Sequence, residues 1–307
     1  MNRKHFLQTL AAGSGLLAAR PLPLLASDPA RTSITKRIPS TGEDLPVIGM
    51  GTWLTFSVPP IPEMITERTK VLRAFFAGGG GMIDSSPMYG PAEQLVGDCL
   101  KEIGYPRSLF SATKIWTSST AQGPQQFENS KRLWGLQRID LEQVHNLVNW
   151  RAHLKTLREL KENGQIRYIG VTTSHGRRHA ELENILRSEP IDFVQLTYNI
   201  ERREVEERLL PLAEDRGIAV IANRPFGGGS IIKSLKRSEE LPAWAPEMGI
   251  QTWADFLLKF IVSHPAVTCA IPATSKVKHM RENMASGKGF LPDLSERKQM
   301  SDYFDSL

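Results

Sequence analysis

The sequence predicts a single (β/α)8 barrel, the TIM-barrel fold, over residues 32–307. Eight short apolar runs alternate with amphipathic stretches of helical spacing. The apolar runs lack a strict alternation of polar and apolar residues, which is typical of parallel strands buried on both faces. Eight strand–helix units in about 250 residues fit a closed barrel better than an open sheet.

The expected strands follow one another along the chain. They cover residues 47–53, 81–86, 109–115, 141–146, 166–173, 192–199, 218–226 and 267–275. Between them, apolar residues recur at helical spacing, most clearly in 64–77, 204–216 and 252–264. Glycines stand where helices commonly end, at Gly78, Gly104, Gly164 and Gly217. We expect residues 32–46 to close the barrel floor as a hairpin, and residues 293–307 to form an additional C-terminal helix.

An open, doubly wound sheet is the alternative arrangement for such a pattern. That fold should show G-x-G-x-x-G after its first strand, and the segment 49–54, GMGTWL, lacks the third glycine. No Pro-, Gly- or Ser-rich linker divides the body, which indicates one domain. Cys99 and Cys269 are both flanked by apolar residues, so we expect two buried thiols and neither a disulfide nor a metal site.

Residues 1–27 are predicted to be an export signal peptide. They have a charged start, a short apolar middle and small residues near Ala26. The segment NRKHFLQ resembles a twin-arginine signal, with Lys4 where the second arginine normally stands. This pattern predicts handling by the export machinery and a periplasmic location. The alternative is a disordered basic tail, which would leave the protein in the cytoplasm.

The net charge of +5 belongs largely to this N-terminal segment. Without Arg3, Lys4 and Arg20 the chain keeps 35 basic and 33 acidic residues. The body has no basic stripe of the kind that binds nucleic acid. No run of 18 apolar residues indicates a membrane span. The expected partner is therefore a small molecule.

Polar residues stand at the ends of several expected strands. Asp84 follows the second strand with Tyr89 just beyond, Lys114 ends the third strand, His145 ends the fourth, and Gln195 lies in the sixth. The C-terminal ends of barrel strands meet at one mouth, where barrel enzymes have their active sites. Each residue alone has an ordinary explanation as a turn cap, a solvated strand end or a core histidine. Together they indicate an active site.

This set is suited to protonating a carbonyl oxygen. A tyrosine pKa of about 10 is too high for acid–base work near neutrality without help. The Lys114 ammonium is expected to lower the pKa of Tyr89, whereas burial raises it. Asp84 would keep Lys114 charged, and His145 could bind the carbonyl oxygen. The set contains no hydride donor, so the sequence predicts a nicotinamide cofactor.

From about residue 45 to 290 the chain resembles the aldo-keto reductase family. The matching motifs, in order, are GMGTW, IDSSPMYGPAEQLVG, SATKIW, RIDLEQVHN, GQIRYIGV, FVQLTYN and IPATSKVKHMRENM. The resemblance implies that Tyr89 is the general acid, that Lys114 and Asp84 tune it, and that His145 orients the substrate carbonyl. It also implies that Trp53 and Trp116 line the substrate pocket.

The resemblance further implies an extended NAD(P)H across the barrel mouth. Gln195 would contact the nicotinamide carboxamide, and the glycines of 224–230 would let backbone amides approach the pyrophosphate. The start of the helix after residue 276 would attract a phosphate. The implied cofactor contacts are Gly51, Thr52, Thr172, Thr173, Gln195, Asn223, Arg224, Pro225, Phe226, Gly227, Gly228, Thr274, Ser275, Lys276, His279, Glu282 and Asn283.

Several positions depart from the family pattern. Asn223 stands where many members have an aromatic residue that stacks on the nicotinamide, and Arg224 could take over stacking or phosphate binding. Thr172 and Thr173 replace a Ser-Asn pair. Ala273 and His279 occupy the positions of a basic pair that some members use for the 2′-phosphate, which leaves Lys276 as the cation. We expect NADP(H) rather than NAD(H).

Three functions follow from these residues. The leading one is an NADP(H)-dependent oxidoreductase that reduces an aldehyde or ketone to an alcohol, or runs the reverse reaction. A second is a nicotinamide-binding sensor or partner subunit with slow turnover, which the changes at Thr173, Asn223 and Ala273 would suit. A third is a barrel hydrolase or aldolase that uses Lys114 as a Schiff-base amine. Asp84 argues against the third because it would keep that lysine protonated.

Overall fold

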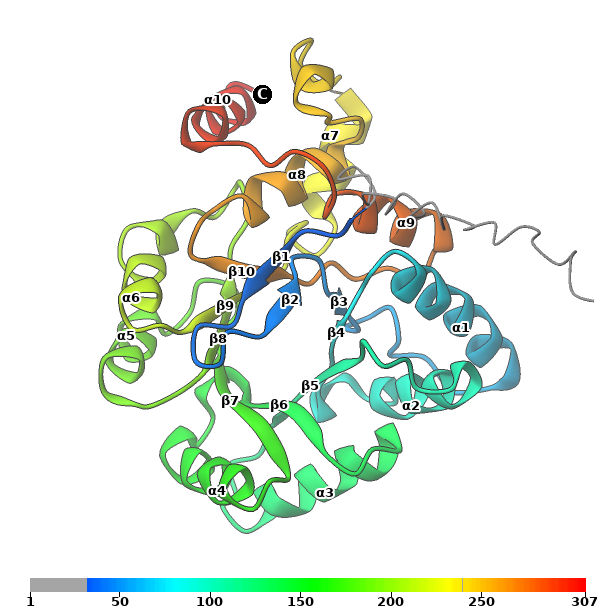
Figure 1. Ribbon diagram of the computed structural model, residues 1–307, viewed down its shortest axis with the longest axis vertical. Coiled ribbons are helices and arrows are strands. Elements are labelled where there is room, and N and C mark those ends of the chain that lie inside the picture. Colours follow the sequence, from blue (N-terminus) through cyan, green and yellow to red (C-terminus); the bar gives the residue numbers. More distant parts are fainter. Residues whose placement is uncertain (1–31, 239) are drawn as a thin grey trace, which may run out of the picture.

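Eight parallel strands form a barrel enclosed by helices in the computed structural model, which describes residues 32–238 and 240–307 (Figure 1). Bridges from Ile48 to Ala270 and from Gly51 to Ala273 join the first strand to the last. The (β/α)8 prediction is confirmed, whereas the predicted signal peptide lies outside the described residues. In barrel order the strands are β3 (Met50–Gly51), β4 (Met82–Asp84), β5 (Phe110–Ile115), β6 (Ile139–Val144), β7 (Ile166–Thr172), β8 (Phe193–Thr197), β9 (Ala219–Asn223) and β10 (Val267–Ala270).

Helices follow the strands and cover the outside of the barrel. They are α1 (Pro62–Ala77), α2 (Ala92–Ile103), α3 (Gln122–Trp134), α4 (Trp150–Glu162), α5 (His179–Ser188), α6 (Leu209–Asp215), α7 (Ser230–Ser238), α8 (Trp253–Val262), α9 (Val277–Ala285) and α10 (Leu294–Asp305). Short 3-10 turns are η1 (Pro87–Tyr89), η2 (His145–Leu147), η3 (Glu204–Glu206) and η4 (Ala245–Met248). The predicted C-terminal helix is α10, which begins with a capping box between Asp293 and Glu296.

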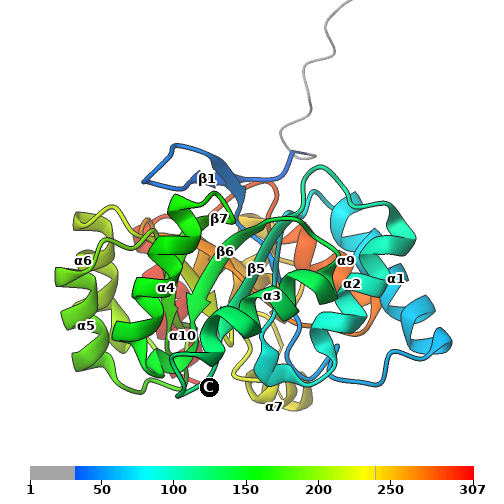
Figure 2. The same ribbon diagram turned by 90° about the horizontal axis from the view of Figure 1, so that it is seen from below.

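An antiparallel hairpin closes one end of the barrel, as the sequence predicts. It consists of β1 (Thr35–Arg37) and β2 (Asp44–Pro46), and Figure 2 shows it at the end opposite α7. Ile38 and Leu45 face the interior below it and belong to a buried cluster with inward residues of the strands. Because this cluster fills the lower half of the barrel, only the other end can open as a cavity. Its other members are Met82, Phe110, Ala112, Leu141, Tyr168, Phe193, Ala219, Ile221, Cys269 and Ile271.

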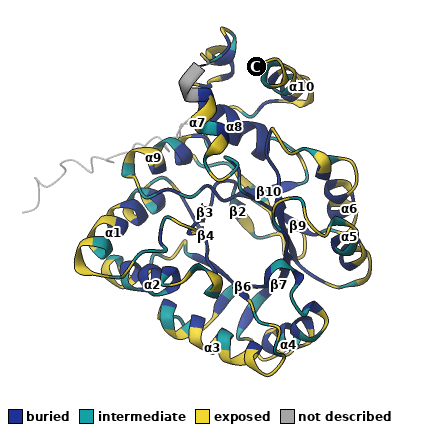
Figure 3. Ribbon diagram, turned by 180° about the vertical axis from the view of Figure 1, so that it is seen from behind, coloured by how far each residue is buried: buried dark blue, intermediate teal, exposed yellow. Residues whose placement is uncertain are grey.

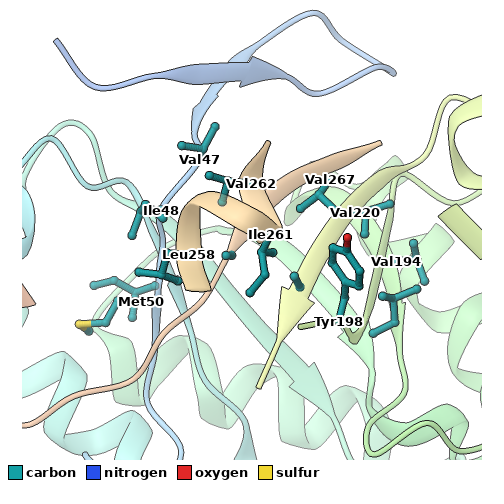
Figure 4. Close-up of a cluster of buried hydrophobic side chains, with 14 of the residues drawn as sticks. Val47, Ile48, Met50, Val194, Tyr198, Val220, Leu258, Ile261, Val262 and Val267 are labelled. Carbon is teal, nitrogen blue, oxygen red and sulfur yellow. The ribbon is translucent and has the colours of Figure 1, made fainter. Parts of the chain in front are cut away.

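A larger apolar core lies between the strands and the helices. Burial is concentrated on the strands and on the inner sides of the helices (Figure 3). Figure 4 shows one part of it, in which Leu258 and Ile261 of α8, Val220 of β9 and Val194 of β8 belong to one buried cluster. Each such side chain contributes about 1.5–3 kcal/mol when fully buried. This packing holds the strand ends in place at the open end of the barrel.

Both cysteines are buried and unbonded, as predicted. Burial raises the pKa of Cys99 to about 11 and that of Cys269 to about 12, so neither thiol ionises near neutral pH. Within residues 32–238 and 240–307, no helix is long and apolar enough to span a bilayer. The same part of the chain holds no group of three or more His, Cys, Asp or Glu residues that could bind a metal ion.

Candidate active site

A cavity of about 510 Å³ opens at the C-terminal ends of the strands. Most of the residues proposed from the sequence line it. They come from the ends of six strands and from the loops that follow them. These residues are Gly51, Thr52, Trp53, Asp84, Tyr89, His145, Thr172, Thr173, Gln195, Asn223, Arg224, Pro225, Phe226 and Gly228. The barrel therefore brings together residues separated by more than half of the chain.

A buried ion pair lies at the base of this cavity. The Nζ of Lys114 donates to Asp84 Oδ2 at 2.7 Å, and it also donates to the Ser85 carbonyl at 2.7 Å. The second oxygen of Asp84 accepts from Gln143 Nε2 at 3.1 Å and from Gln195 Nε2 at 2.9 Å. Burial alone would lower the pKa of Lys114, but the Asp84 carboxylate outweighs it and raises that pKa. Lys114 is therefore charged.

Tyr89 ends the η1 turn and lies between Lys114 and His145. The Lys114 Nζ is 5.4 Å from the centroid of the Tyr89 ring, and the Tyr89 and His145 rings meet edge to face at 5.7 Å. Burial raises the pKa of Tyr89 and outweighs the opposing effect of the Lys114 charge. Both expected effects on this pKa are present, the ammonium lowering it and burial raising it, and burial is the larger of the two. The phenol keeps its proton at neutral pH.

His145 is a neutral imidazole held by a serine. Its Nδ1 lies 2.8 Å from the Ser86 hydroxyl oxygen, and that oxygen also accepts from the Met88 backbone N–H at 3.1 Å. Burial, followed by the charge of Lys114, lowers the pKa of His145 to about 2. His145 can therefore donate one hydrogen bond and accept another, and it carries no charge at neutral pH.

The part of the cavity after β7 and β9 can receive a flat polar ring. The Thr173 hydroxyl is buried and has no hydrogen-bond partner. Beside it, Asn223 is fully engaged: it accepts from the Thr197 hydroxyl at 2.7 Å, and it donates to the Thr173 carbonyl at 2.9 Å. Asn223 therefore joins the ends of β7, β8 and β9 by hydrogen bonds. The unpartnered Thr173 hydroxyl is available to bind a ligand.

Other residues proposed from the sequence do not line the cavity. Lys114 lies beneath the cavity floor and is fully buried. Trp116 is 41% exposed, and its backbone N–H and carbonyl are both held by the Gln126 side chain. Asn283 is only 2% exposed on α9. The remaining ones are Gly227, Thr274, Ser275, Lys276, His279 and Glu282.

Lys276 is the N-cap residue of α9, at a helix start where an anion could bind. Thr274 accepts a hydrogen bond from the Lys276 backbone N–H at 3.1 Å, which shapes the turn before the helix. Lys276 is exposed. A helix N-terminus with a free cation attracts a phosphate group.

Sequence reasoning missed two groups of residues. Gln143 lies in β6 two residues before His145, which directly follows that strand, so the alternation of side chains along a strand predicts that both point inward. Ser86 belongs to the IDSSPMYG motif, and nothing in its local sequence marks it as the partner of His145. His175, Arg177 and Arg178 line the cavity from the loop after β7, and no periodic signal marks them.

Comparison with known proteins gives consistent matches. The family described as Aldo/keto reductase family matches residues 47–296. Methylglyoxal reductase YeaE of Escherichia coli is 26% identical over 81% of this chain and 88% of its own length. Aldo-keto reductase str7 of Strobilurus tenacellus is 24% identical over 74% of this chain and 78% of its own length. The crystal structure of an aldo/keto reductase from Klebsiella pneumoniae with NADP and acetate is similar in fold, with a TM-score of 0.75, 24% identity, and coverage of 89% of this chain and 96% of that one.

The buried, neutral state of His145 predicts a loss of stability in mild acid. The folded protein keeps His145 unprotonated down to about pH 2, whereas the unfolded chain binds a proton below its ordinary pKa of 6.5. Above pH 6.5 His145 is neutral in both states and has no effect on the unfolding free energy. Below pH 6.5 protonation of the unfolded chain lowers the unfolding free energy progressively. Between pH 8 and pH 5 it should cost about 2 kcal/mol of unfolding free energy. Urea unfolding at both pH values measures this loss.

The matched control is His145→Gln, which keeps a polar side chain without a titrating ring. Its loss of unfolding free energy between the two pH values should be smaller than that of the wild type by the same amount. His264, whose pKa burial also lowers, is present in both proteins and cancels. Equal losses in the two proteins would show that His145 is not held neutral.

Proposed function

The chain belongs to the aldo/keto reductase family, and from that premise we propose that it reduces an aldehyde or ketone to an alcohol, or runs the reverse reaction, with NADP(H). The observation that carries this proposal is the charged Lys114 buried against Asp84 directly beneath the protonated Tyr89. Together with His145, this arrangement presents a proton donor and a neutral hydrogen-bonding ring to one cavity. The substrate is a small carbonyl compound or alcohol.

The residues of the mouth fit a nicotinamide cofactor. When bound, it supplies the hydride. The unpartnered Thr173 hydroxyl would hold the carboxamide, and the backbone around Gly228, with φ of +77°, would admit the phosphates. The exposed Lys276 at the start of α9 favours a cofactor with a 2′-phosphate. A similar fold from Klebsiella pneumoniae holds NADP.

Tyr89 would act as the general acid on the carbonyl oxygen. Its raised pKa keeps the proton in place until a carbonyl oxygen gains negative charge. When Tyr89 gives up the proton, the fixed charge of Lys114 stabilises the phenolate that forms. Asp84 acts through Lys114, because it keeps that ammonium charged and oriented.

His145 would donate a second hydrogen bond to the same oxygen through Nε2. The fully buried Ser86 hydroxyl has two neighbours, the Met88 N–H and His145 Nδ1. Because the Met88 N–H can only donate, the Ser86 proton has one available acceptor, His145 Nδ1. That bond leaves the ring proton on Nε2. Since Ser86 also caps the η1 turn that carries Tyr89, a single hydroxyl orients both groups.

The competing functions fit the geometry less well. A Schiff base needs an accessible neutral amine, whereas Lys114 is fully buried, charged and bonded to Asp84 and Ser85. A slow nicotinamide-binding sensor would follow from the changes at Thr173, Asn223 and Ala273, whereas the proton donor Tyr89 keeps its contacts with Lys114 and His145. The sensor differs from the reductase in rate alone, which the following experiment measures.

Replacing Tyr89 with phenylalanine should abolish most turnover. General acid catalysis contributes about 10²–10⁴-fold, so kcat with NADPH and small aldehydes should fall by at least about 100-fold. The dissociation constant of NADPH, measured by fluorescence, should change little. Tyr105→Phe, a change at an exposed tyrosine, is the matched control and should keep full activity. Absence of turnover in the wild type despite tight NADPH binding would favour the sensor.

Replacing Ser86 with alanine should remove the hydrogen bond that keeps the ring proton of His145 on Nε2, so that the proton can occupy either ring nitrogen. We expect nitrogen-15 NMR to show mainly the Nε2–H tautomer in the wild type and a mixture in Ser86→Ala, together with a fall in kcat of about tenfold. Ser130→Ala removes another buried serine hydroxyl, bonded to Glu93, and controls for stability. An unchanged tautomer in Ser86→Ala would refute this role of Ser86.

We also propose that residues 1–27 direct export of the protein to the periplasm, on the charged start and apolar middle of that segment. Fractionation of cells that express the full chain should recover a shortened protein, beginning near Asp28, in the periplasmic fraction. A chain in which Arg3 and Lys4 are both changed to glutamine should stay in the cytoplasm at full length. Recovery of the unshortened wild type from the cytoplasm would count against export.

A further inference from the structure

Three arginines gather over one side of the cavity mouth, and we refer to them as the arginine rim. Arg177 follows β7, Arg202 follows β8 and Arg224 follows β9. Arg177 and Arg224 line the cavity, and an Nη1 atom of Arg202 would lie 3.4 Å from a Cβ placed on Gly176, in the loop that carries Arg177. Neighbouring strand ends thus direct three guanidinium groups to one place.

The loop after β7 is held in a strained conformation. His175 and Arg178 have φ of +63° and +59°, in the left-handed region that disfavours residues other than glycine. Contacts hold the loop there: the His175 N–H donates to the Thr197 hydroxyl at 3.0 Å, and Arg178 Nη1 donates to the Asn146 carbonyl at 2.7 Å. Such strain persists where the surrounding structure enforces it, commonly at ligand sites.

The rim charges lack partners of opposite sign. Arg178 pairs with Glu181, but no described carboxylate lies within 4 Å of Arg177, Arg202 or Arg224. Glu204, which also approaches Gly176, makes no ion pair with Arg202 in the described part of the chain. Arg224 instead lies 5.4 Å from the centre of the Trp53 ring. The three guanidinium groups of the rim are therefore a concentration of positive charge without a direct ion pair among the described residues.

The arginines repel one another and their neighbour. The pKa of His175 is lowered by burial and then by the charges of Arg224, Arg177 and Arg202. The pKa of Arg224 is lowered by burial and by Arg202. Among the described residues that line the cavity, the only carboxylate is that of Asp84, and its oxygens are occupied. An anion entering the cavity would relieve the repulsion among the arginines, and Glu204 beside Gly176 lies outside the cavity lining.

We propose that the arginine rim selects carbonyl substrates that carry a carboxylate or a phosphate group. This inference rests on the proposed reductase function, because it concerns the same cavity. The position of Arg177 separates it from the region proposed for the cofactor phosphates. Those sites follow β9 and β10, whereas Arg177 follows β7, two and three strands away in the barrel. Arg224, which would lie 3.0 Å from a Cβ on Gly228, borders both regions.

The test compares two pairs of related aldehydes, each with one charged and one neutral member. The carboxylate pair is 4-carboxybenzaldehyde and its methyl ester, and the phosphate pair is glyceraldehyde 3-phosphate and glyceraldehyde. The wild type should have the lower KM for the charged member of at least one pair, and that pair identifies the preferred anion. Arg177→Gln should raise the KM for that charged member by about tenfold, the effect of losing one charge-assisted contact. It should leave the neutral member within about twofold, and Arg177→Lys should keep most of the preference.

Three outcomes would overturn the proposal. The wild type could show no preference for either charged aldehyde, or Arg177→Gln could change charged and neutral members equally. Arg177→Gln could also weaken NADPH binding, measured by fluorescence, while the preference for the charged aldehyde persists. That last result would assign Arg177 to the cofactor phosphates.

Binding without turnover separates this proposal from the reductase function. Calorimetry of the NADPH complex, in which an alcohol cannot be oxidised, should show tighter binding of 4-carboxybenzyl alcohol than of benzyl alcohol, and Arg177→Gln should abolish the difference. If the wild type reduces no aldehyde yet binds the charged alcohol more tightly, the reductase function fails and the anion site stands. If it reduces aldehydes but binds both alcohols equally, the anion site fails alone.

Discussion

The buried pair of Lys114 and Asp84 is the constraint on which the site depends. Removing two charges from water costs several kcal/mol per ion, and mutual attraction offsets this only when the other hydrogen-bonding positions are also filled. Here they are filled: Ser85 accepts from Lys114, while Gln143 and Gln195 donate to Asp84. These partners belong to β6, β8 and the end of β4. The pair therefore joins β4, β5, β6 and β8 through side-chain contacts and sets the charge at the base of the cavity.

The same pair governs the two groups above it. Lys114 opposes the rise that burial causes in the pKa of Tyr89, and it adds to the fall that burial causes in the pKa of His145. A protonated phenol and a neutral imidazole result, and both can donate a proton or a hydrogen bond without carrying charge themselves. The Lys114 ammonium attracts Tyr89 most strongly when the phenol loses its proton and becomes negative. This attraction therefore stabilises the transition state more than the resting state.

The sequence predicted the barrel and the base of the site because strand ends obey simple geometry. Eight apolar runs and the order of the strands place Asp84, Lys114 and His145 at one end, whatever the details of packing. The direction in which the pKa of Tyr89 shifts could not be predicted from strand order, because it depends on the balance between burial and one nearby charge. The loop after β7 was also beyond reach, since the left-handed residues His175 and Arg178 are held by tertiary contacts and carry no local turn signal.

Asn223 shows how a departure from a family pattern can be absorbed by the structure. The sequence marks the loss of an aromatic surface at this position, which suggests a weaker hold on a flat ring. In the structure, the Asn223 amide joins the ends of β7, β8 and β9 through Thr173, Gln195 and Thr197. The flat cation of the next residue, Arg224, lies over the Trp53 ring, with its backbone carbonyl held by Asn199. Guanidinium groups stack on aromatic planes, so Arg224 puts a flat, positively charged group beside the Trp53 ring, one residue along the chain from Asn223. Whatever the role of Arg224, the loss of the aromatic residue at Asn223 leaves three strand ends joined by hydrogen bonds and a cation at the cavity.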